Sequence, residues 1–508
     1  MALPLPADRP PAVLPGRGKG HRLCGRNPAP AHQRPERPRG HRRLLPDFWP
    51  LRTVQVSQLG RQILYRRPAD PGCRPYRRPA APVCRLNICQ SWRGGLSNRP
   101  ISNLQKGTIA LLKLVSFIAL LVSALPAGYL ALMALASVRG PQRRQTAGPA
   151  PATRFAIAIP AHDEAAVIAR TVRRLAALNY PPELYTVHVV ADHCTDSTAA
   201  AARQAGAVVH ERNSGPRTGK GAALSWLFRQ ILSDPRIDAV VVFDADTRVE
   251  PDFLRVMDAR LQAGAQVVQG QHVISNPDSG WFPALTWAMF LVDNRFQNLG
   301  RTNLGWSAKN MGDSICFRAD VLRRVGWGEG LTEDYQLRQK LLLEGIKIEY
   351  EPAAIGYGEA PRTWAQARAQ RARWLRGTHD ASRQFARRLL AEALRRRDPA
   401  LADGALQAYL PAYSTLTMAG GLALAGQVAL NWLAGPLFPR GLLAGWLGLV
   451  AGLFVYPLFG LALEAAPLRA YLAILSGPFF IVWRTWLAAT ARFGRRQVPW
   501  IRTAHGES

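Results

Sequence analysis

Two carboxylates lie one residue apart in the segment VVVFDADTRVEPDF, which covers residues 240–253. The apolar residues before them, ending at Phe243, predict a buried parallel strand that delivers Asp244 and Asp246 to its carboxyl end. Like charges this close raise each other's pKa unless a cation or hydrogen-bond donors neutralise them. Mg²⁺ or Mn²⁺ would do so, because such a cation takes one or two protein carboxylates and completes its shell with phosphate and water. The pair therefore indicates a metal-bound phosphate ligand, although exposed strand ends often carry Asp without one.

A second segment, RTGKGAAL at residues 217–224, supplies a basic group for such phosphates. Lys220 lies between two glycines directly before a predicted helix, whose start adds free N–H groups and a partial positive charge. The spacing is not that of a P-loop, so this segment alone is a weak signal.

These motifs lie in a region that alternates strands and helices. RFAIAIPAH (154–162), YTVHVVAD (185–192), AVVHE (207–211) and AVVVFDAD (239–246) predict strands, and helices are expected over 165–178, 197–205 and 221–232. This alternation predicts an α/β domain with a mostly parallel sheet. Three of the strands end in PAHDEA, ADHCTD and DADT, so polar groups gather at the carboxyl edge, where such sheets bind ligands.

A further acid begins a later helix. The segment GEGLTEDYQLRQKLLLEG (328–345) predicts a helix with Thr332 as N-cap and with Glu333 and Asp334 in its first turn. A capping role is a sufficient explanation for Glu333.

A cationic and aromatic helix face follows in RTWAQARAQRARWLRG (362–377). Gln370, Arg373 and Trp374 are spaced i, i+3, i+4 and share one face. Considered alone, an Arg beside an aromatic just before a membrane region is equally well explained as a snorkelling interfacial helix.

In order, the chain carries ADHCTD, DAD, TED and QRARW, and the run from Ala156 to about Gly377 resembles the family 2 glycosyltransferases. It is most similar to their membrane-embedded, processive branch, which includes cellulose, hyaluronan, chitin and poly-N-acetylglucosamine synthases. The order of the four motifs is specific, whereas residues 1–104 lie outside the resemblance. The resemblance implies a GT-A type α/β domain with a mostly parallel sheet, inserted between transmembrane helices.

The resemblance also implies roles on the donor side. Asp192 matches the acid that contacts the nucleotide base. Asp244 and Asp246 match the Asp-x-Asp motif that holds the ribose and the metal-bound diphosphate, with Asp246 as the ligand of Mg²⁺ or Mn²⁺. Lys220 matches the basic position of a Lys-containing loop.

Roles at the reacting centre follow in the same way. Asp334, the last residue of TED, matches the general base. QRARW matches the Gln-x-x-Arg-Trp signature through Gln370, so that Arg371 and Arg373 would face the diphosphate and Trp374 the acceptor sugar.

The chemistry that these residues could perform is coherent. Breaking a sugar–diphosphate bond puts charge on the leaving oxygens, so the site needs a cation and Arg or Lys donors already in place. Attack by an acceptor hydroxyl needs a base within hydrogen-bond reach, and Asp334 is the candidate on a separate element. A base opposite the leaving group gives a single displacement with inversion. The segment NMGDSICFR (310–318) looks like the acceptor-side loop of the family, but it carries Asp313 where we expect a small or neutral residue.

Apolar blocks at 108–138, about 408–433 and 442–463 are each long enough to span a bilayer. A fourth block, 471–489, holds Arg484 between Trp483 and Trp486, which suits an interfacial or tilted helix as well as a span. The basic segment RGPQRRQ after the first block favours the cytoplasm. Three crossings after the domain would place the basic end of the chain outside, so we expect an even number of crossings.

The chain of 508 residues carries a net charge of +31, and residues 1–104 contribute 20 Arg and Lys against 4 Asp and Glu. This Pro- and Arg-rich segment has no periodicity and is interpreted as disordered, either a basic tail for phosphate groups or, by preference, a spurious translated extension. The cysteines match no zinc pattern and form no disulfide framework. The predicted units are therefore 1–104, a transmembrane helix at 105–138, a cytoplasmic glycosyltransferase domain at 150–390, membrane or interfacial helices at 405–490, and a basic tail at 491–508.

Three functions are weighed. The first is an inverting polysaccharide synthase of the bacterial inner membrane that uses a nucleotide-diphosphate sugar, with UDP as the expected nucleotide, and a second subunit for export or assembly. The second is a transferase that adds one sugar to a lipid-linked acceptor. The third, a membrane-tethered binder of nucleic acid or anionic surfaces, is disfavoured because the basic tail has few aromatic residues; we expect no nucleic-acid partner.

Overall fold

The computed structural model describes residues 103–140, 150–328 and 330–493, and the statements below concern these residues. The expectations for the basic segment before residue 103, for its four cysteines and for the tail from residue 494 lie outside the described residues.

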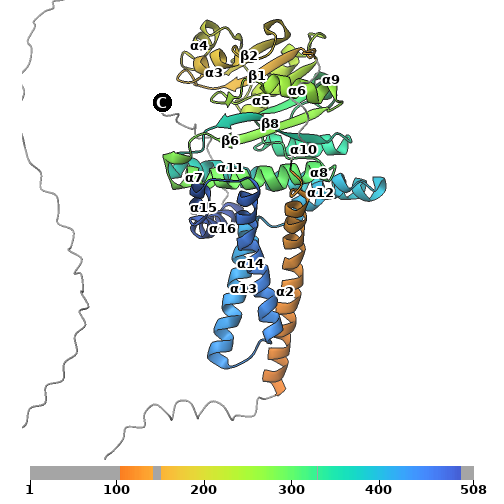
Figure 1. Ribbon diagram of the computed structural model, residues 1–508, viewed down its shortest axis with the longest axis vertical. Helices are drawn as coiled ribbons and strands as arrows, with labels where there is room; N and C mark the ends of the chain where they lie inside the picture. The colour runs from red at the N-terminus through yellow and green to blue at the C-terminus, as the bar shows by residue number, and fades with distance from the viewer. Residues whose placement is uncertain (1–102, 141–149, 329, 494–508) are drawn as a thin grey trace, which may run out of the picture. The chain divides into compact units, whose positions relative to one another are not determined.

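Eight strands form one mixed sheet in the order β3-β2-β1-β4-β7-β6-β8-β5 (Figure 1). They are β1 (Phe155–Ala161), β2 (Tyr185–Asp192), β3 (Val208–Arg212), β4 (Ala239–Val242), β5 (Arg248–Val249), β6 (Val267–Ile274), β7 (Ile315–Arg318) and β8 (Ile348–Gly358). All neighbouring pairs are parallel except those in which β7 or β5 takes part. The predicted α/β class with a mostly parallel sheet is confirmed.

Helices cover both faces of this sheet. Helices α3 (Ile168–Leu175), α4 (Thr198–Gln204) and α6 (Phe253–Gln262) supply one apolar cluster, and α5 (Lys220–Ile231), α9 (Ala319–Val325) and α10 (Glu333–Leu343) supply the other. Strand β1 serves both, because Phe155 and Ile157 face the first cluster and Ala156 and Ala158 face the second. A strand buried on both sides has a continuous apolar sequence, and this apolar run is the signal that predicted β1.

Strand β4 ends one residue earlier than the predicted apolar run. The amide of Phe243 still bonds the carbonyl of Ala158 at 3.1 Å, but the amide of Asp244 instead donates to the side chain of Asp313 at 3.0 Å. The backbone therefore leaves the ladder at the point where the two carboxylates begin, and Phe243 remains fully buried.

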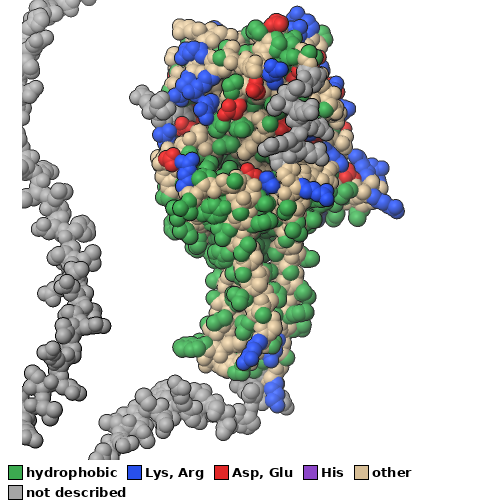
Figure 2. Space-filling view, in the orientation of Figure 1, with side chains coloured by type: hydrophobic (Ala, Val, Ile, Leu, Met, Phe, Trp, Pro, Cys, Tyr) green, Lys and Arg blue, Asp and Glu red, His purple; other side chains and the backbone are tan. Residues whose placement is uncertain are grey.

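Three helices are long and apolar enough to cross a membrane: α2 (Asn103–Ala136), α13 (Tyr413–Ala434) and α14 (Arg440–Leu463). They contact one another, and the exposed side chains along them are largely hydrophobic (Figures 1 and 2). The fourth block is broken into α15 (Leu468–Ile474) and α16 (Gly477–Phe493), bent by 46°, so the pair counts as one more span at most. The three predicted spans are confirmed as candidate membrane helices, whereas the number of crossings stays a prediction.

A layer of helices joins the sheet to the membrane helices. It contains α7 (Trp281–Asp293), the π-helical η3 (Asn294–Leu299), α8 (Gly300–Asn303), α11 (Trp364–Arg396) and α12 (Pro399–Tyr409). Two short 3₁₀ turns also occur: η1 (Pro182–Leu184) precedes β2, and η2 (Pro277–Ser279) precedes α7. The predicted QRARW helix is therefore the first half of a 33-residue helix that begins with a capping box at Thr363.

A buried ionic cluster locks this layer together. The carboxylate of Asp403 in α12 accepts hydrogen bonds from Arg301 in α8 at 3.0 Å, from Arg338 in α10 at 3.0 Å and from the hydroxyl of Tyr129 in α2 at 2.6 Å. Both Asp403 ion pairs are almost completely excluded from solvent. Helix α10 is thus tied to membrane helix α2 through a single carboxylate.

Candidate active site

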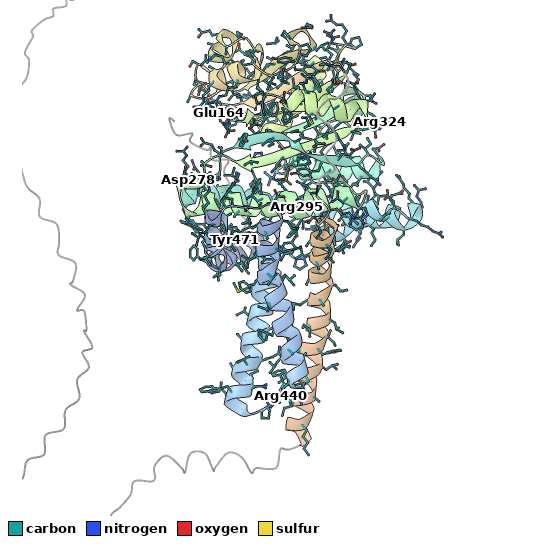
Figure 3. All side chains as sticks on the ribbon, in the orientation of Figure 1. Glu164, Asp278, Arg295, Arg324, Arg440 and Tyr471 are labelled. Carbon is teal, nitrogen blue, oxygen red and sulfur yellow. The ribbon has the colours of Figure 1, made fainter. Side chains whose placement is uncertain are left out.

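A cavity of about 1410 Å³ opens at the carboxyl edge of the sheet. Its wall is built by the ends of β1, β2 and β4, the starts of α5 and α10, and helix α11, with Glu164 among its lining residues (Figure 3). All nine residues predicted for the site line this one cavity: Asp192, Lys220, Asp244, Asp246, Asp334, Gln370, Arg371, Arg373 and Trp374. Asp192, Asp244 and Asp246 are brought together because parallel strands end on the same edge, whereas the other six residues are contributed by helices α5, α10 and α11.

The first residue of α5 neutralises the end of β4. The ammonium of Lys220 forms an ion pair with Asp244 and donates a hydrogen bond to the carbonyl of Gly312. Burial alone would lower the pKa of Lys220, but the carboxylates of Asp244 and Glu333 raise it above its ordinary value. The Lys220 ammonium is therefore a positive charge beside Asp244, and it neutralises part of the negative charge of the Asp244 and Asp246 pair.

Asp313 supports the loop that follows β4 and carries Asp244. Its carboxylate accepts the Asp244 amide at 3.0 Å and the Thr247 hydroxyl at 3.1 Å, and it pairs with the ring of His272 at 2.9 Å. Burial opposes its ionisation, but the hydrogen bond with His272 keeps the pKa of Asp313 below its usual range. The acid that looked out of place in the sequence thus shapes the loop that presents Asp244.

Asp192 is buried at the end of β2 and is paired with Arg212, the last residue of β3. The second guanidinium nitrogen of Arg212 donates to the carbonyl of Pro216 at 2.8 Å, and this fixes the start of the loop that carries Lys220. Sequence reasoning missed Arg212. The only signal was its place as a basic residue at the end of the neighbouring parallel strand.

The candidate base begins helix α10. A Cβ atom built on Gly312 would lie 3.3 Å from Oδ2 of Asp334, so the glycine allows the 312–313 loop to lie directly against this carboxylate. Burial raises the pKa of Asp334, while Lys220 and Arg373 act against the increase. Burial and the adjacent Asp334 charge also raise the pKa of Glu333 to about 7. Two carboxyl groups with raised pKa values at one helix start are suited to proton transfer near neutral pH.

Thr332 occupies the predicted N-cap position of α10, but its hydroxyl makes no capping bond. The side chain instead packs against Gly377 of α11. The predicted N-cap position is therefore confirmed, although the Thr332 side chain contacts Gly377 and does not bond the first turn.

Arg371 and Arg373 have different surroundings although both line the cavity. Arg373 is among the cations that act on Asp334. Arg371 lies over the rings of Trp374 at 4.6 Å and Phe480 at 5.7 Å, and Arg484 and Asp293 are the charged groups that act on its pKa. The expected diphosphate role of Arg371 stays a prediction.

One group of metal-type side chains stands apart from the carboxylate pair. Ligand atoms of His162, Asp163 and Cys194 lie within 4.8 Å of one another. Both ring nitrogens of His162 are already engaged, by the carbonyl of Asp192 and by Arg217, and Asp163 accepts the amide of Thr195 at 2.6 Å. This group braces the loops after β1 and β2 rather than offering a free ligand set.

The α/β domain is similar in sequence to known glycosyltransferases. Residues 151–377 match the family described as glycosyltransferase like family 2. The β-monoglucosyldiacylglycerol synthase of Nostoc sp. is 31% identical over 233 residues, which cover 44% of this chain and 48% of that protein. The poly-β-1,6-N-acetyl-D-glucosamine synthase of Staphylococcus aureus is 26% identical over 232 residues, which cover 43% of this chain and 53% of that protein.

Among solved structures, the mannosyltransferase PcManGT of Pyrobaculum calidifontis, in complex with GDP-Man and Mn²⁺, is similar at 16% identity with a TM-score of 0.48. The match covers 76% of this chain and 100% of that chain.

The chain spans about half the length of the curated relatives it matches. The expected likeness to family 2 glycosyltransferases is confirmed for residues 151–377, and the named relatives agree with the expected class of enzyme. Membership of the membrane-embedded, processive branch stays a prediction.

Proposed function

We propose that this protein is an inverting membrane glycosyltransferase that moves a sugar from a nucleotide-diphosphate sugar, with UDP as the expected nucleotide, to a hydroxyl group of a membrane-held acceptor. The observation that carries the proposal is the single cavity that joins Asp244, Asp246 and Lys220 at one end to Asp334 on a separate helix. Cation-neutralised carboxylates and a buried base facing one space are what sugar transfer from a diphosphate requires.

The donor would bind at the carboxyl edge of the sheet. Asp192 is positioned for the nucleotide base and Asp244 for the ribose, with Lys220 and Arg373 available to the diphosphate. Two half-buried carboxylates one residue apart are an all-oxygen donor set, which fits Mg²⁺ or Mn²⁺. Asp246 would hold that ion, which when bound stabilises the charge that develops on the leaving phosphate.

Asp334 would take the proton of the attacking hydroxyl. Its raised pKa makes it a stronger base than an exposed carboxylate once it is ionised. Asp334 is on α10 and the metal-binding pair follows β4, so the base and the groups that hold the leaving diphosphate are carried by separate elements of the cavity wall. With one carboxylate as base and none needed as nucleophile, the reaction would be a single displacement with inversion.

The acceptor would come from the membrane side. Past Gln370 and Trp374 the cavity lining continues to membrane helices α2, α13 and α14, including Tyr129, Tyr413 and Tyr456. A growing glycan in polysaccharide synthesis, with a second subunit for export or assembly, and a lipid-linked acceptor that receives one sugar both fit this route. The protein would lie in the bacterial inner membrane as a multi-pass protein with its α/β domain in the cytoplasm.

Product analysis tests the proposal directly. Membranes that contain the full chain are given radiolabelled nucleotide sugars one at a time with Mg²⁺ or Mn²⁺, and lipid-soluble and polymeric products are separated. Label should enter one of the two fractions from a single donor, and membranes carrying Asp246→Asn should incorporate none. Incorporation by the Asp246→Asn protein at the wild-type rate would refute the proposal.

A further inference from the structure

Two arginines line the membrane-side part of the cavity, and no ion pair links either of them to a carboxylate among the described residues. Arg371 in α11 is only 7% exposed, and its Nε has no hydrogen-bond partner among the described residues. Arg484 in α16 lines the same cavity and acts on Arg371 as a like charge. Asp293, the acid that acts on Arg371, is already bound by Lys309 at 2.6 Å. Three cations thus share one carboxylate in a space of low polarity.

Such an excess of buried positive charge is costly unless an anion accompanies it. Burial and the neighbouring Arg484 lower the pKa of Arg371 to about 9, so the pair is strained even though Arg371 is still a cation at neutral pH. Guanidinium groups are suited to this task because they bind phosphate oxygens through two parallel hydrogen bonds.

The donor diphosphate is a poor candidate for this anion. Arg371 and Arg373 are two residues apart on a helix, so their side chains leave the axis about 200° apart. Arg373 is among the cations that lower the pKa of Asp334, whereas the guanidinium of Arg371 lies over the rings of Trp374 at 4.6 Å, Phe480 at 5.7 Å and Phe282 at 5.9 Å. Arg371 is therefore held among aromatic rings of α7, α11 and α16, and the charged groups that act on its pKa are Arg484 and Asp293.

Helix α16 indicates where the anion comes from. Phe480 and Leu487 pack inward on the face that also carries Arg484, whereas Phe479 and Trp486 are 59% and 51% exposed on the other face. Trp281 and Trp364 are also exposed and contact Phe479. Aromatic side chains exposed along one face beside membrane helices are typical of a membrane–water interface. Arg484 therefore lies behind an exposed aromatic face of the kind that membrane proteins place at lipid headgroups.

We propose that Arg371 and Arg484 bind the phosphate group of a membrane lipid that serves as the acceptor or as its carrier. The inference rests on the proposed function and names its acceptor class. The lipid phosphate would lie between α11 and α16, with its sugar or hydroxyl end directed along Trp374 to Asp334. The chemistry recognised is a phosphate mono- or diester, and the exposed aromatic face selects a lipid over a soluble phosphate.

Binding without turnover tests this directly. The full chain, purified in neutral detergent, is titrated with radiolabelled dioleoyl phosphatidic acid, and dioleoylglycerol serves as the same lipid without phosphate. Phosphatidic acid should bind more tightly, and Arg371→Gln or Arg484→Gln should each weaken it by about tenfold or more, the effect of losing a charge-assisted hydrogen bond. Arg388→Gln, an exposed arginine of the same helix, should bind as wild type.

Titration of UDP with Mn²⁺ into the same variants separates this proposal from the proposed function. UDP affinity should be unchanged in Arg371→Gln and Arg484→Gln, and the two variants should unfold at no lower temperature than wild type because a like-charge contact is removed. Loss of UDP binding with intact lipid binding would overturn the lipid site and assign Arg371 to the diphosphate. Inorganic phosphate that displaces the lipid at equal concentration would overturn the lipid source. If the protein transferred no sugar, the proposed function would fail, but the phosphatidic acid titration would still test the lipid-phosphate site.

Discussion

A Cβ atom built on Gly377 would lie 2.5 Å from Oγ1 of Thr332, so helices α10 and α11 touch backbone to side chain at this point. The contact joins the helix that carries Asp334 to the helix that carries Gln370, Arg373 and Trp374. Thr332 is β-branched, so its χ1 rotation is restricted, and three of its atoms lie within 3 Å of that position. A side chain at residue 377 would therefore have to push the two helices apart.

Gly377→Ala should separate the two helices and lower the transfer rate by about a hundredfold, the cost expected when reacting groups are displaced by roughly an ångström. Helix propensity alone would favour alanine, so the loss cannot come from a weaker helix. Turnover of the purified variant measures the effect. Gly421→Ala, at a helical glycine with open space around it, is the matched control and should be as active as wild type. Normal activity in both variants would show that the contact is not needed.

The Asp403 cluster should dominate the stability of the join between domain and membrane helices. Asp403→Asn leaves Arg301 and Arg338 buried with a weaker partner, and removal of one member of a buried ion pair costs about 3–5 kcal/mol. Thermal unfolding of the full chain in detergent would show a large decrease in the midpoint. Asp320→Asn, which breaks an exposed pair with Arg318, should change stability by less than about 1 kcal/mol. Equal effects of the two substitutions would contradict the role given to Asp403.

Transfer should depend on pH through the acid pair at the start of α10. A base works in its ionised form, and the pKa of Asp334 is raised, so the rate should fall as the pH falls through a value above the ordinary aspartate range. Glu333, whose pKa is raised to about 7, contributes negative charge above that pH. Because the charge of Asp334 raises the pKa of Glu333, Asp334 ionises first, and Glu333→Gln should leave the acid limb of the pH–rate profile in place. A limb that moves to lower pH in Glu333→Gln would show that Glu333 is already ionised while Asp334 titrates.

Much of this architecture follows from local patterns. Continuous apolar runs predicted β1, β2 and β4, and span-length blocks predicted α2, α13 and α14, because burial on both faces and contact with lipid each leave a signature along the chain. The strand ends predicted that Asp192 and Asp244 meet at one edge, and both line one cavity there, to which α10 adds Asp334.

Pairings between distant segments were not predictable in this way. Neither the bond from Asp313 to the Asp244 amide nor the Arg212–Asp192 pair has a local signature, since both depend on which strands become neighbours. The different surroundings of Arg371 and Arg373 did have a local signature, because side chains two positions apart on a helix leave its axis about 200° apart. The break between α15 and α16 falls at Leu475 and Ser476, directly before Gly477 and Pro478, so here the sequence did carry a local signal for the interruption.

The metal assignment predicts that Asp246→Asn abolishes transfer. The substitution keeps the shape of the side chain but removes a charged oxygen ligand, so Mn²⁺ should no longer strengthen UDP binding. Calorimetric titration of UDP with and without Mn²⁺ into wild type and variant measures this. Asp252→Asn, at an exposed acid remote from the cavity lining, is the control. A variant that still shows metal-dependent UDP binding would place the ion elsewhere.

The most direct test compares Asp334→Asn with Arg373→Ala in the purified full chain, by transfer rate and by UDP–Mn²⁺ affinity. Asp334→Asn should lower the turnover rate by about a hundredfold or more, the usual contribution of a positioned base, with donor affinity almost unchanged. Arg373→Ala should instead weaken UDP binding, because it removes a charge-assisted partner of the diphosphate. Strong loss of UDP binding in Asp334→Asn, with none in Arg373→Ala, would contradict the assignment of base and donor site.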